Sequence, residues 1–211
     1  MFVCWSSKGG CGTSVVAASL ALLTARSQHS LLVDLDGDLP GVLGLAEPSG
    51  PGVGDWLASP VADTTALLGL TVPVTDRLEL LPVGCPVDRP AAVRWSALAA
   101  ALAQADQEVV VDAGLGNPPD ALLGHGARSL LVIRPCYLAI RRAATLTARV
   151  DGVVMVVEPG RALGRRDVEH AIGAPVVAEV PYDPQVSRSV DSGLMASRLP
   201  WSLRHALRIP A

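Results

Sequence analysis

Lysine is almost absent from this chain. Of its 17 Lys and Arg residues, 16 are arginines, and the single lysine is Lys8. A soluble chain of 211 residues carries on the order of ten lysines at average usage. A general preference for arginine and alanine explains the shortage, but it does not explain where the remaining lysine lies.

Cysteine and histidine are too sparse and too scattered to build a metal site. No two of the four cysteines form a C-x-x-C pair, which excludes a zinc site and a disulfide framework. The four histidines are equally dispersed, so they indicate neither a metal site nor a catalytic dyad. We expect small buried hydrophobic side chains in a reducing cytosol at Cys4, Cys11, Cys85 and Cys136.

Long apolar runs are also missing. The longest, Val15–Ala25, is too short to span a bilayer and is interrupted by Ser19 and Thr24. The first residues show no charged segment ahead of an apolar one, as a secretory signal does. We therefore expect a cytoplasmic protein, which can also lie peripherally at the membrane, the cell pole or the nucleoid.

The net charge of −3 argues against a dedicated nucleic-acid protein, but the charge is distributed unevenly. Residues 1–125 hold 5 basic and 13 acidic side chains, whereas residues 126–211 hold 12 basic and 7 acidic ones. Aromatic residues make up only 3% of the chain, so base stacking beside the arginines is disfavoured. An anionic partner, either DNA or membrane lipid, is expected to dock on the second half.

Short apolar runs alternate with alanine-rich stretches of helical length. Strands that are apolar throughout are typical of a parallel sheet covered on both faces, so the pattern predicts a doubly wound, mostly parallel α/β fold in a single domain over residues 1–211. The predicted strands are Phe2–Trp5, Leu31–Asp34, Leu78–Pro82, Val109–Asp112, Leu130–Arg134, Val153–Val157 and Val176–Val180. The predicted helices are Ser14–Arg26, Pro90–Ala105, Leu138–Arg149, Gly164–Ile172 and Pro184–Val190, with short ones near Trp56 and Leu67 in an otherwise irregular section, 37–76.

A glycine-rich segment, Ser6–Ser14, joins the first predicted strand to the first predicted helix. Backbone N–H groups of such a turn, together with the positive end of the helix, form an anion site, and glycines let phosphate oxygens approach. A strict G-x-x-x-x-G-K-[ST] pattern fails, because Ser7 stands where glycine belongs and Thr13 where lysine belongs. The deviant Walker A pattern K-G-G-x-G-[K]-[ST] fits with the one mismatch at Thr13.

At this point the sequence resembles the MinD/ParA superfamily of nucleotide-dependent positioning ATPases, and Lys8 occupies the lysine position that distinguishes the superfamily. The resemblance implies bound ATP or ADP with Mg²⁺. It implies a nucleotide site at Lys8, Gly9, Gly10, Cys11, Gly12, Thr13 and Ser14, with the Ser14 hydroxyl on the Mg²⁺. It also implies a homodimer in the ATP-bound state, in which Lys8 acts across the interface on the partner's phosphates.

Three further segments carry the same resemblance. In Leu32–Asp36 the second carboxylate, Asp36, corresponds to the residue that positions the attacking water, so Lys8 and Asp36 are the implied catalytic residues. Val109–Gly116 looks like the Walker B strand and its switch, and Asp112 would then hold Mg²⁺ through water.

Near the end of the chain, Pro181, Tyr182 and Asp183 are similar to the segment that lines the adenine. Glu158 stands where the family often has an asparagine that reads the base, which puts base selectivity in doubt.

Thr13 weakens the expected activity. Loss of one charge-assisted hydrogen bond to phosphate costs about 1.5–3 kcal/mol, or about a ten- to hundredfold loss of affinity. A threonine here with the first lysine retained is similar to the CpaE/TadZ branch, which marks sites of pilus assembly, and a septum-site branch is equally close. That branch usually has an extra N-terminal receiver-like domain, which does not fit into the residues before Lys8.

Several functions remain open at the level of sequence. The first is an ATP-switched dimer that positions a pilus or secretion machinery, a septum site or a chromosomal or plasmid cargo, with weak or partner-stimulated hydrolysis and an unidentified protein partner. The second is a non-hydrolysing scaffold. A ligase of the dethiobiotin synthetase type is a weaker alternative, and a nitrogenase iron protein is disfavoured because no cysteine lies close to Asp112.

Overall fold

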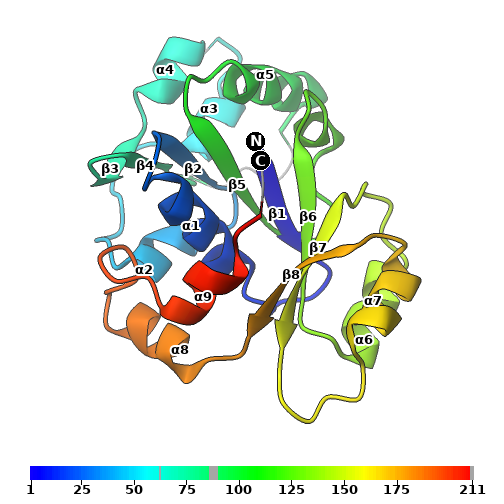
Figure 1. The fold of residues 1–211 in the computed structure, drawn as a ribbon. Helices are drawn as coiled ribbons and strands as arrows, with labels where there is room; N and C mark the ends of the chain where they lie inside the picture. The colour runs from blue at the N-terminus through cyan, green and yellow to red at the C-terminus, as the bar shows by residue number, and fades with distance from the viewer. Residues whose placement is uncertain (62, 86–89, 210–211) are drawn as a thin grey trace.

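An eight-stranded sheet forms the centre of the molecule (Figure 1). The computed structural model describes residues 1–61, 63–85 and 90–209. The strand order is β3-β4-β2-β5-β1-β6-β7-β8, and every neighbouring pair is parallel except β3 with β4. The strands are β1 (Phe2–Ser6), β2 (Ser30–Asp34), β3 (Val72–Thr75), β4 (Leu78–Leu81), β5 (Glu108–Leu115), β6 (Arg128–Ile133), β7 (Gly152–Val157) and β8 (Val176–Pro181).

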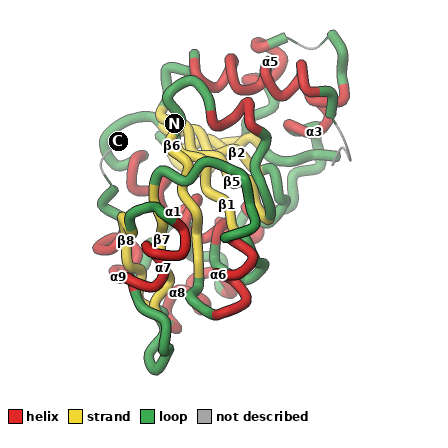
Figure 2. Tube along the Cα trace, turned by 90° about the vertical axis from the view of Figure 1, so that its right-hand side faces the viewer, coloured by secondary structure: helices red, strands yellow, loops and turns green. Residues whose placement is uncertain are grey.

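Helices cover both faces of this sheet (Figures 1 and 2). They are α1 (Thr13–Thr24), α2 (Leu39–Leu43), α3 (Val53–Ala58), α4 (Thr64–Leu68), α5 (Ala92–Ala103), α6 (Tyr137–Ala143), α7 (Arg165–Ile172), α8 (Pro184–Asp191) and α9 (Trp201–Ala206), with a 3₁₀ turn at Asp120–Leu123. The central strands are buried on both sides, which explains why they read as continuous apolar runs.

Alternate residues of each strand enter different cores. Leu32 and Val110 pack with α1, α2 and α9 on one face, whereas Leu31 and Val109 pack with α3 and α5 on the other. Helix α1 is largely shielded from solvent: eight of its twelve residues are buried. It can be buried on most sides because small or apolar residues occur all around the helix. The sheet and α1 therefore form a rigid frame for the loop between β1 and α1.

The predicted α/β fold is confirmed, and all seven predicted strands are present. Strand β3 was not predicted, because Val72–Thr75 lies in the irregular section and contains Pro73, which only an edge strand tolerates. Helix α6 is shorter than predicted and ends at Ala143. There the Thr145 hydroxyl donates to the Arg142 carbonyl at 2.8 Å and competes with continued helix.

Two further comparisons with the sequence concern the cysteines and the membrane. Cys4 and Cys11 are buried as expected, but Cys85 is exposed and Cys136 is half-buried, so the expectation is wrong for these two. Both lie outside the strands and helices, Cys85 in the loop after β4 and Cys136 directly before α6, where a small side chain has less to pack against. Within the described residues, no helix combines the length and the apolar character needed to cross a membrane.

Candidate functional site

The loop after β1 lies where the strand order of the sheet reverses. Strand β1 has β5 and β2 on one side and β6, β7 and β8 on the other, so its carboxyl end borders the crevice between the two sets. In open α/β sheets, ligands bind outside the carboxyl ends of strands at such a point. The predicted phosphate loop, Asp36 just after β2 and Asp112 toward the end of β5 all lie at this edge.

The glycines leave the outer side of this loop open. Gly10 and Gly12 have φ angles of 75° and 87°, which glycine adopts without steric cost. A Cβ atom at Gly9, Gly10 or Gly12 would meet nothing within 4 Å. Helix α1 begins directly after Gly12, and its first turn contains no acidic residue. An anion can therefore reach the backbone N–H groups and the positive end of α1.

Neighbouring elements hold the ends of the loop in place. The Ser7 hydroxyl donates to the Ala139 carbonyl of α6 at 2.9 Å, and the Gly116 N–H donates to the Ser6 carbonyl at 2.9 Å. Cys11 is buried against the core. These contacts fix the conformation of the loop before any ligand binds.

Lys8 has no strong partner of its own. Its Nζ donates to the adjacent Gly9 carbonyl at 3.3 Å, and in the described part of the chain it forms no ion pair. The side chain is half-buried at the edge of the loop. Its ammonium group is therefore available to a phosphate or to a second molecule.

Asp112 is the most perturbed carboxyl group of the site. Burial raises its pKa to about 7, while nearby Ser14 and the Gly114 N–H oppose that rise. Oδ1 accepts from the Gly114 N–H at 3.2 Å. Oδ2 is buried and accepts no hydrogen bond of good geometry from any described residue. The nearby Ser14 hydroxyl does not provide one either.

The orphaned oxygen of Asp112 fits a hard cation. Mg²⁺ binds through one or two protein oxygens and keeps several waters and substrate phosphates as its other ligands. The carboxylate of Asp112 and the hydroxyl of Ser14 are donors of this kind, and a cation would stabilise the ionised form that burial disfavours. These two residues therefore suit a Mg²⁺ ion.

The two aspartates at the end of β2 differ in role. Asp34 is fully buried and accepts from the N–H groups of Asp36, Gly37 and Leu39 at 3.1, 2.7 and 3.2 Å, so it shapes the turn. Asp36 is exposed, and its carboxylate lies against Gly114, where a Cβ atom would come within 2.3 Å of Oδ1. The parallel pairing of Asp34 with Asp112 brings both segments together. Of the two, Asp36 is the carboxylate that can meet a ligand.

Thr13 begins α1, and only 7% of its surface is exposed. Its side chain is packed into the protein instead of extending over the open side of the loop. A hydroxyl also lacks the reach and the charge of the lysine that the phosphate-loop pattern places here. The loop therefore relies on its backbone and on Lys8 for positive charge.

The segment after β8 lies at the same edge of the sheet. Tyr182 is 48% exposed, and its N–H donates to the Val157 carbonyl at 2.7 Å. Asp183 starts α8, and its two oxygens accept from the Gln185 N–H and the Ser202 hydroxyl, at 2.8 and 2.7 Å. The Asp183 carboxylate is thus occupied by the fold, while the tyrosine ring and the Pro181 backbone are exposed.

An arginine cluster at this edge was not predicted from the sequence. Glu158, after β7, forms ion pairs with Arg134, after β6, and with Arg161. The Arg134 guanidinium carbon lies 5.3 Å from the centre of the Tyr182 ring, and the Arg134 backbone lies beside the Cys11 thiol, whose pKa burial raises. Because these residues are far apart in sequence, only the pairing of β6, β7 and β8 reveals the cluster.

A scan against models of known protein families finds no match, and no curated protein matches the sequence significantly. Solved structures do match in fold. The ParA family ATPase from Chlorobium tepidum superposes with a TM-score of 0.80 at 22% identity, over 97% of this chain and 95% of that one. MinD from Pyrococcus horikoshii, complexed with Mg-ADP, gives 0.75 at 17% identity, over 97% and 91%.

A third match is the MinC:MinD cell division complex of Aquifex aeolicus, with a TM-score of 0.73 at 21% identity, over 91% of this chain and 85% of that one. The chain therefore has the fold of the MinD/ParA ATPases, as the sequence predicted. At these identities the likeness establishes the fold, and the function is argued from the site.

Proposed function

We propose that this chain is an ATP-dependent switch that positions a cellular structure. The observation that carries the proposal is the meeting of three sequence-distant groups at one sheet edge: the open glycine loop with Lys8, the exposed Asp36, and the buried Asp112 with its orphaned oxygen. Similar folds occur in a ParA family ATPase and in MinD with Mg-ADP.

In this proposal each group has one task. The backbone of Gly9, Gly10 and Gly12 donates to the nucleotide phosphates, and Ser14 and Asp112 hold Mg²⁺, directly and through water respectively. The ion supplies positive charge beside the phosphates. Thr13 and the buried Cys11 contribute backbone only, because their side chains face the core.

Asp36 accepts a hydrogen bond from the attacking water and orients it. Lys8, which forms no ion pair within the described residues, reaches the phosphates of a second subunit, which makes the ATP-bound form a homodimer. A compact ammonium fits between two glycine loops better than the larger fork of an arginine. This requirement explains why the single lysine of the chain lies here.

Pro181 and Tyr182 border the base, with Asp183 holding their segment against α9 through Ser202. The cargo, and whether the chain belongs to the CpaE/TadZ branch, remain predictions from the loop pattern. So do a cytoplasmic location with peripheral attachment at the membrane, pole or nucleoid, and a protein partner that stimulates hydrolysis.

ATP-dependent dimerisation tests the proposal. We expect wild-type protein with ATP and Mg²⁺ to elute as a dimer in size-exclusion chromatography with light scattering, and Lys8→Ala to remain monomeric. Arg166→Ala is the control, because Arg166 is an exposed cation of helix α7, away from the glycine loop. Monomeric wild type that behaves like Lys8→Ala would contradict the proposal.

The second candidate is a scaffold that does not hydrolyse ATP. Two observations favour it. Thr13 provides no positive charge for the nucleotide phosphates, and the Arg134–Glu158–Arg161 cluster lies beside Tyr182, in the segment expected to border the base. Turnover of wild type beside Thr13→Lys separates the candidates. The switch predicts measurable wild-type turnover and about ten- to hundredfold tighter ATP binding by Thr13→Lys. The scaffold predicts no turnover in wild type.

The expected anionic partner of the second half is also a proposal. Its arginines are spread over both faces of the sheet: Arg141 and Arg142 lie on α6, whereas Arg188 and Arg204 lie on α8 and α9. Each set can be removed separately and tested for retention on duplex DNA and on anionic vesicles.

A further inference from the structure

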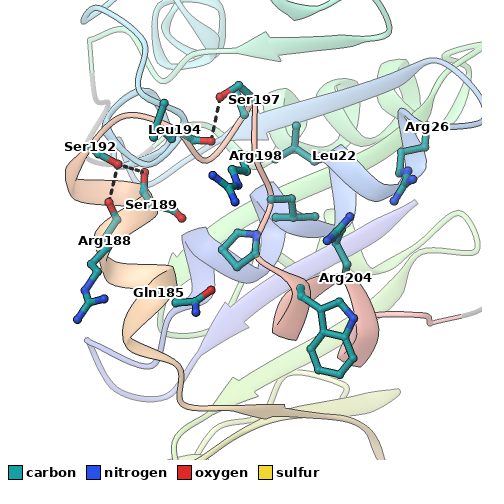
Figure 3. Close-up of a pocket in the computed structure, with 14 residues that line it drawn as sticks. Leu22, Arg26, Gln185, Arg188, Ser189, Ser192, Leu194, Ser197, Arg198 and Arg204 are labelled. Atoms are coloured by element: carbon teal, nitrogen blue, oxygen red, sulfur yellow. Dashed lines mark hydrogen bonds between the residues drawn. The ribbon is translucent and has the colours of Figure 1, made fainter.

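A second concave site lies away from the glycine loop, between the end of α1, α8, the loop 192–200 and α9 (Figure 3). The cavity has a volume of about 800 Å³. Volumes of roughly 300–1,000 Å³ are typical of small-molecule sites. The glycine loop, Asp36, Asp112 and Tyr182 do not line this cavity; Gln185, whose N–H donates to Asp183, is its link to the site described above.

The lining of the cavity is cationic. Four arginines come from four different segments: Arg26 after α1, Arg188 on α8, Arg198 in the loop and Arg204 on α9 (Figure 3). None of the lining residues is acidic. Several positive charges around one hollow give it a positive potential, which favours entry of an anion.

These arginines also differ from others in the chain. Arg134, Arg149, Arg161 and Arg165 each form an ion pair with a carboxylate. Among the described residues, no ion pair involves any of the four cavity arginines. The charge of Arg188 acts on Asp183 and helps to lower the pKa of that carboxyl. This carboxylate is beyond ion-pair distance, however, so the guanidinium donors of all four arginines are available to a ligand.

The walls of the cavity are held by the fold. Gly193 lies against Gly44, where a Cβ atom on Gly44 would come within 2.3 Å of the Gly193 carbonyl oxygen, and Met195 of the same loop is fully buried. At the other wall, the Ser202 hydroxyl donates to Asp183 at 2.7 Å and joins α9 to α8. A preformed site loses less conformational entropy on binding than a flexible one.

A second hollow adjoins the first. Its volume is about 540 Å³, and it shares Arg26, Trp201 and Arg204 with the first while adding Arg208. The adjoining hollow also has apolar walls, which include Leu20 and Leu23.

We propose that the four-arginine cavity binds a small molecule with two or more phosphate groups. Guanidinium forks match phosphate oxygens in bidentate geometry, and four of them exceed what a single carboxylate requires. A concave site bordered by four segments favours a compact ligand. Duplex DNA, by contrast, is bound by an open basic stripe that runs along its backbone. The proposal does not depend on ATP binding at the glycine loop.

Isothermal titration calorimetry with inorganic tripolyphosphate tests it. We expect the double variant Arg188→Gln/Arg198→Gln to bind tripolyphosphate at least tenfold more weakly than wild type, or to lose one binding event if the glycine loop also binds the probe. The matched control, Arg142→Gln/Arg166→Gln, removes the same charge outside the cavity and should bind like wild type. Lys8→Ala should retain the cavity event.

Three outcomes would overturn the proposal. The first is equal binding by wild type and the cavity variant, and the second is equal loss in the matched control, which would indicate an effect of net charge. The third is that wild type does not bind tripolyphosphate at all. If the cavity variant then loses retention on short duplex DNA or on phosphatidylglycerol vesicles, the arginines serve that surface instead, and the proposal is equally overturned. The substituted arginines are exposed, so unchanged unfolding temperatures will confirm that the variants fold.

Discussion

Single residues set the geometry of the nucleotide edge. Gly114 is the clearest case, because its φ angle is 65° and its Cα faces the carboxylate of Asp36. Asp112 is another, because its buried carboxyl has one oxygen without a partner in the described structure. Each leads to a prediction about one substitution.

Gly114→Ala should destabilise the protein and displace Asp36. The left-handed backbone costs about 1–2 kcal/mol for a residue with a Cβ atom, and that atom would come within 2.3 Å of Asp36 Oδ1. Gly116→Ala is the matched control, since Gly116 has a φ of 97° and nothing within 4 Å of its Cβ position. Urea unfolding should show the larger loss for Gly114→Ala, and equal losses would contradict the contact.

Asp112→Asn should stabilise the metal-free protein at neutral pH. The folded-state pKa is raised to about 7, above the unfolded value, so the unfolded state releases this proton first. Stability is therefore lost as pH rises from about 4 to 7 and stays lower above that. Between pH 5 and 8 this costs about 2–3 kcal/mol.

The isosteric variant cannot ionise but keeps an oxygen to accept from Gly114. Thermal unfolding of both proteins in chelator should give a gap in favour of Asp112→Asn at pH 8 that closes toward pH 5. A constant gap would show that ionisation of Asp112 is not its cause. With Mg²⁺ present, wild type should recover stability at pH 8 and the variant should not.

At the scale of elements, α9 shows how a short amphipathic helix is used. The sequence places Leu203, Ala206 and Leu207 on one side and Arg204 on another. Such an amphipathic segment can bind a membrane surface or dock onto its own domain. In the structure, Leu203 and Leu207 are 1% and 2% exposed and belong to the core around α1.

Leu203→Ala should therefore reduce stability by about 2–4 kcal/mol, because the vacated volume lies in a packed core. Trp201→Ala, on the same helix, should change stability by less than about 0.5 kcal/mol, since Trp201 is 65% exposed. Chemical denaturation of the two variants measures the difference. A small effect of Leu203→Ala would show that α9 is not docked in solution.

At the scale of the whole molecule, one hydrophobic core joins the two halves of the chain. Strand β1 pairs with β6 from the second half, and Leu203 and Leu207, near the end of the chain, pack in the same core as α1. The sheet is completed only when distant segments have met. This supports the prediction of a single domain.

We therefore expect a single cooperative unfolding transition. Tryptophan fluorescence, dominated in the core by the buried Trp5 and Trp56, should change at the same denaturant concentration as far-ultraviolet circular dichroism. Residues 1–125 alone should remain unfolded, since they lack β6 beside β1. Two separated transitions would indicate two independently stable parts.

The sequence by itself determined much of this protein: the order of strands and helices, through apolar runs and alanine-rich stretches, and the phosphate loop, through Lys8 and the glycines after it. These signals are local, because each is set by neighbours in the chain. The tertiary structure alone decided which distant groups meet. The register of β2 with β5 brings Asp36 to Gly114, the pairing of β6 and β7 joins Arg134 to Glu158, and four segments surround the arginine cavity. Such contacts depend on the packing of the sheet, and no spacing along the chain encodes them.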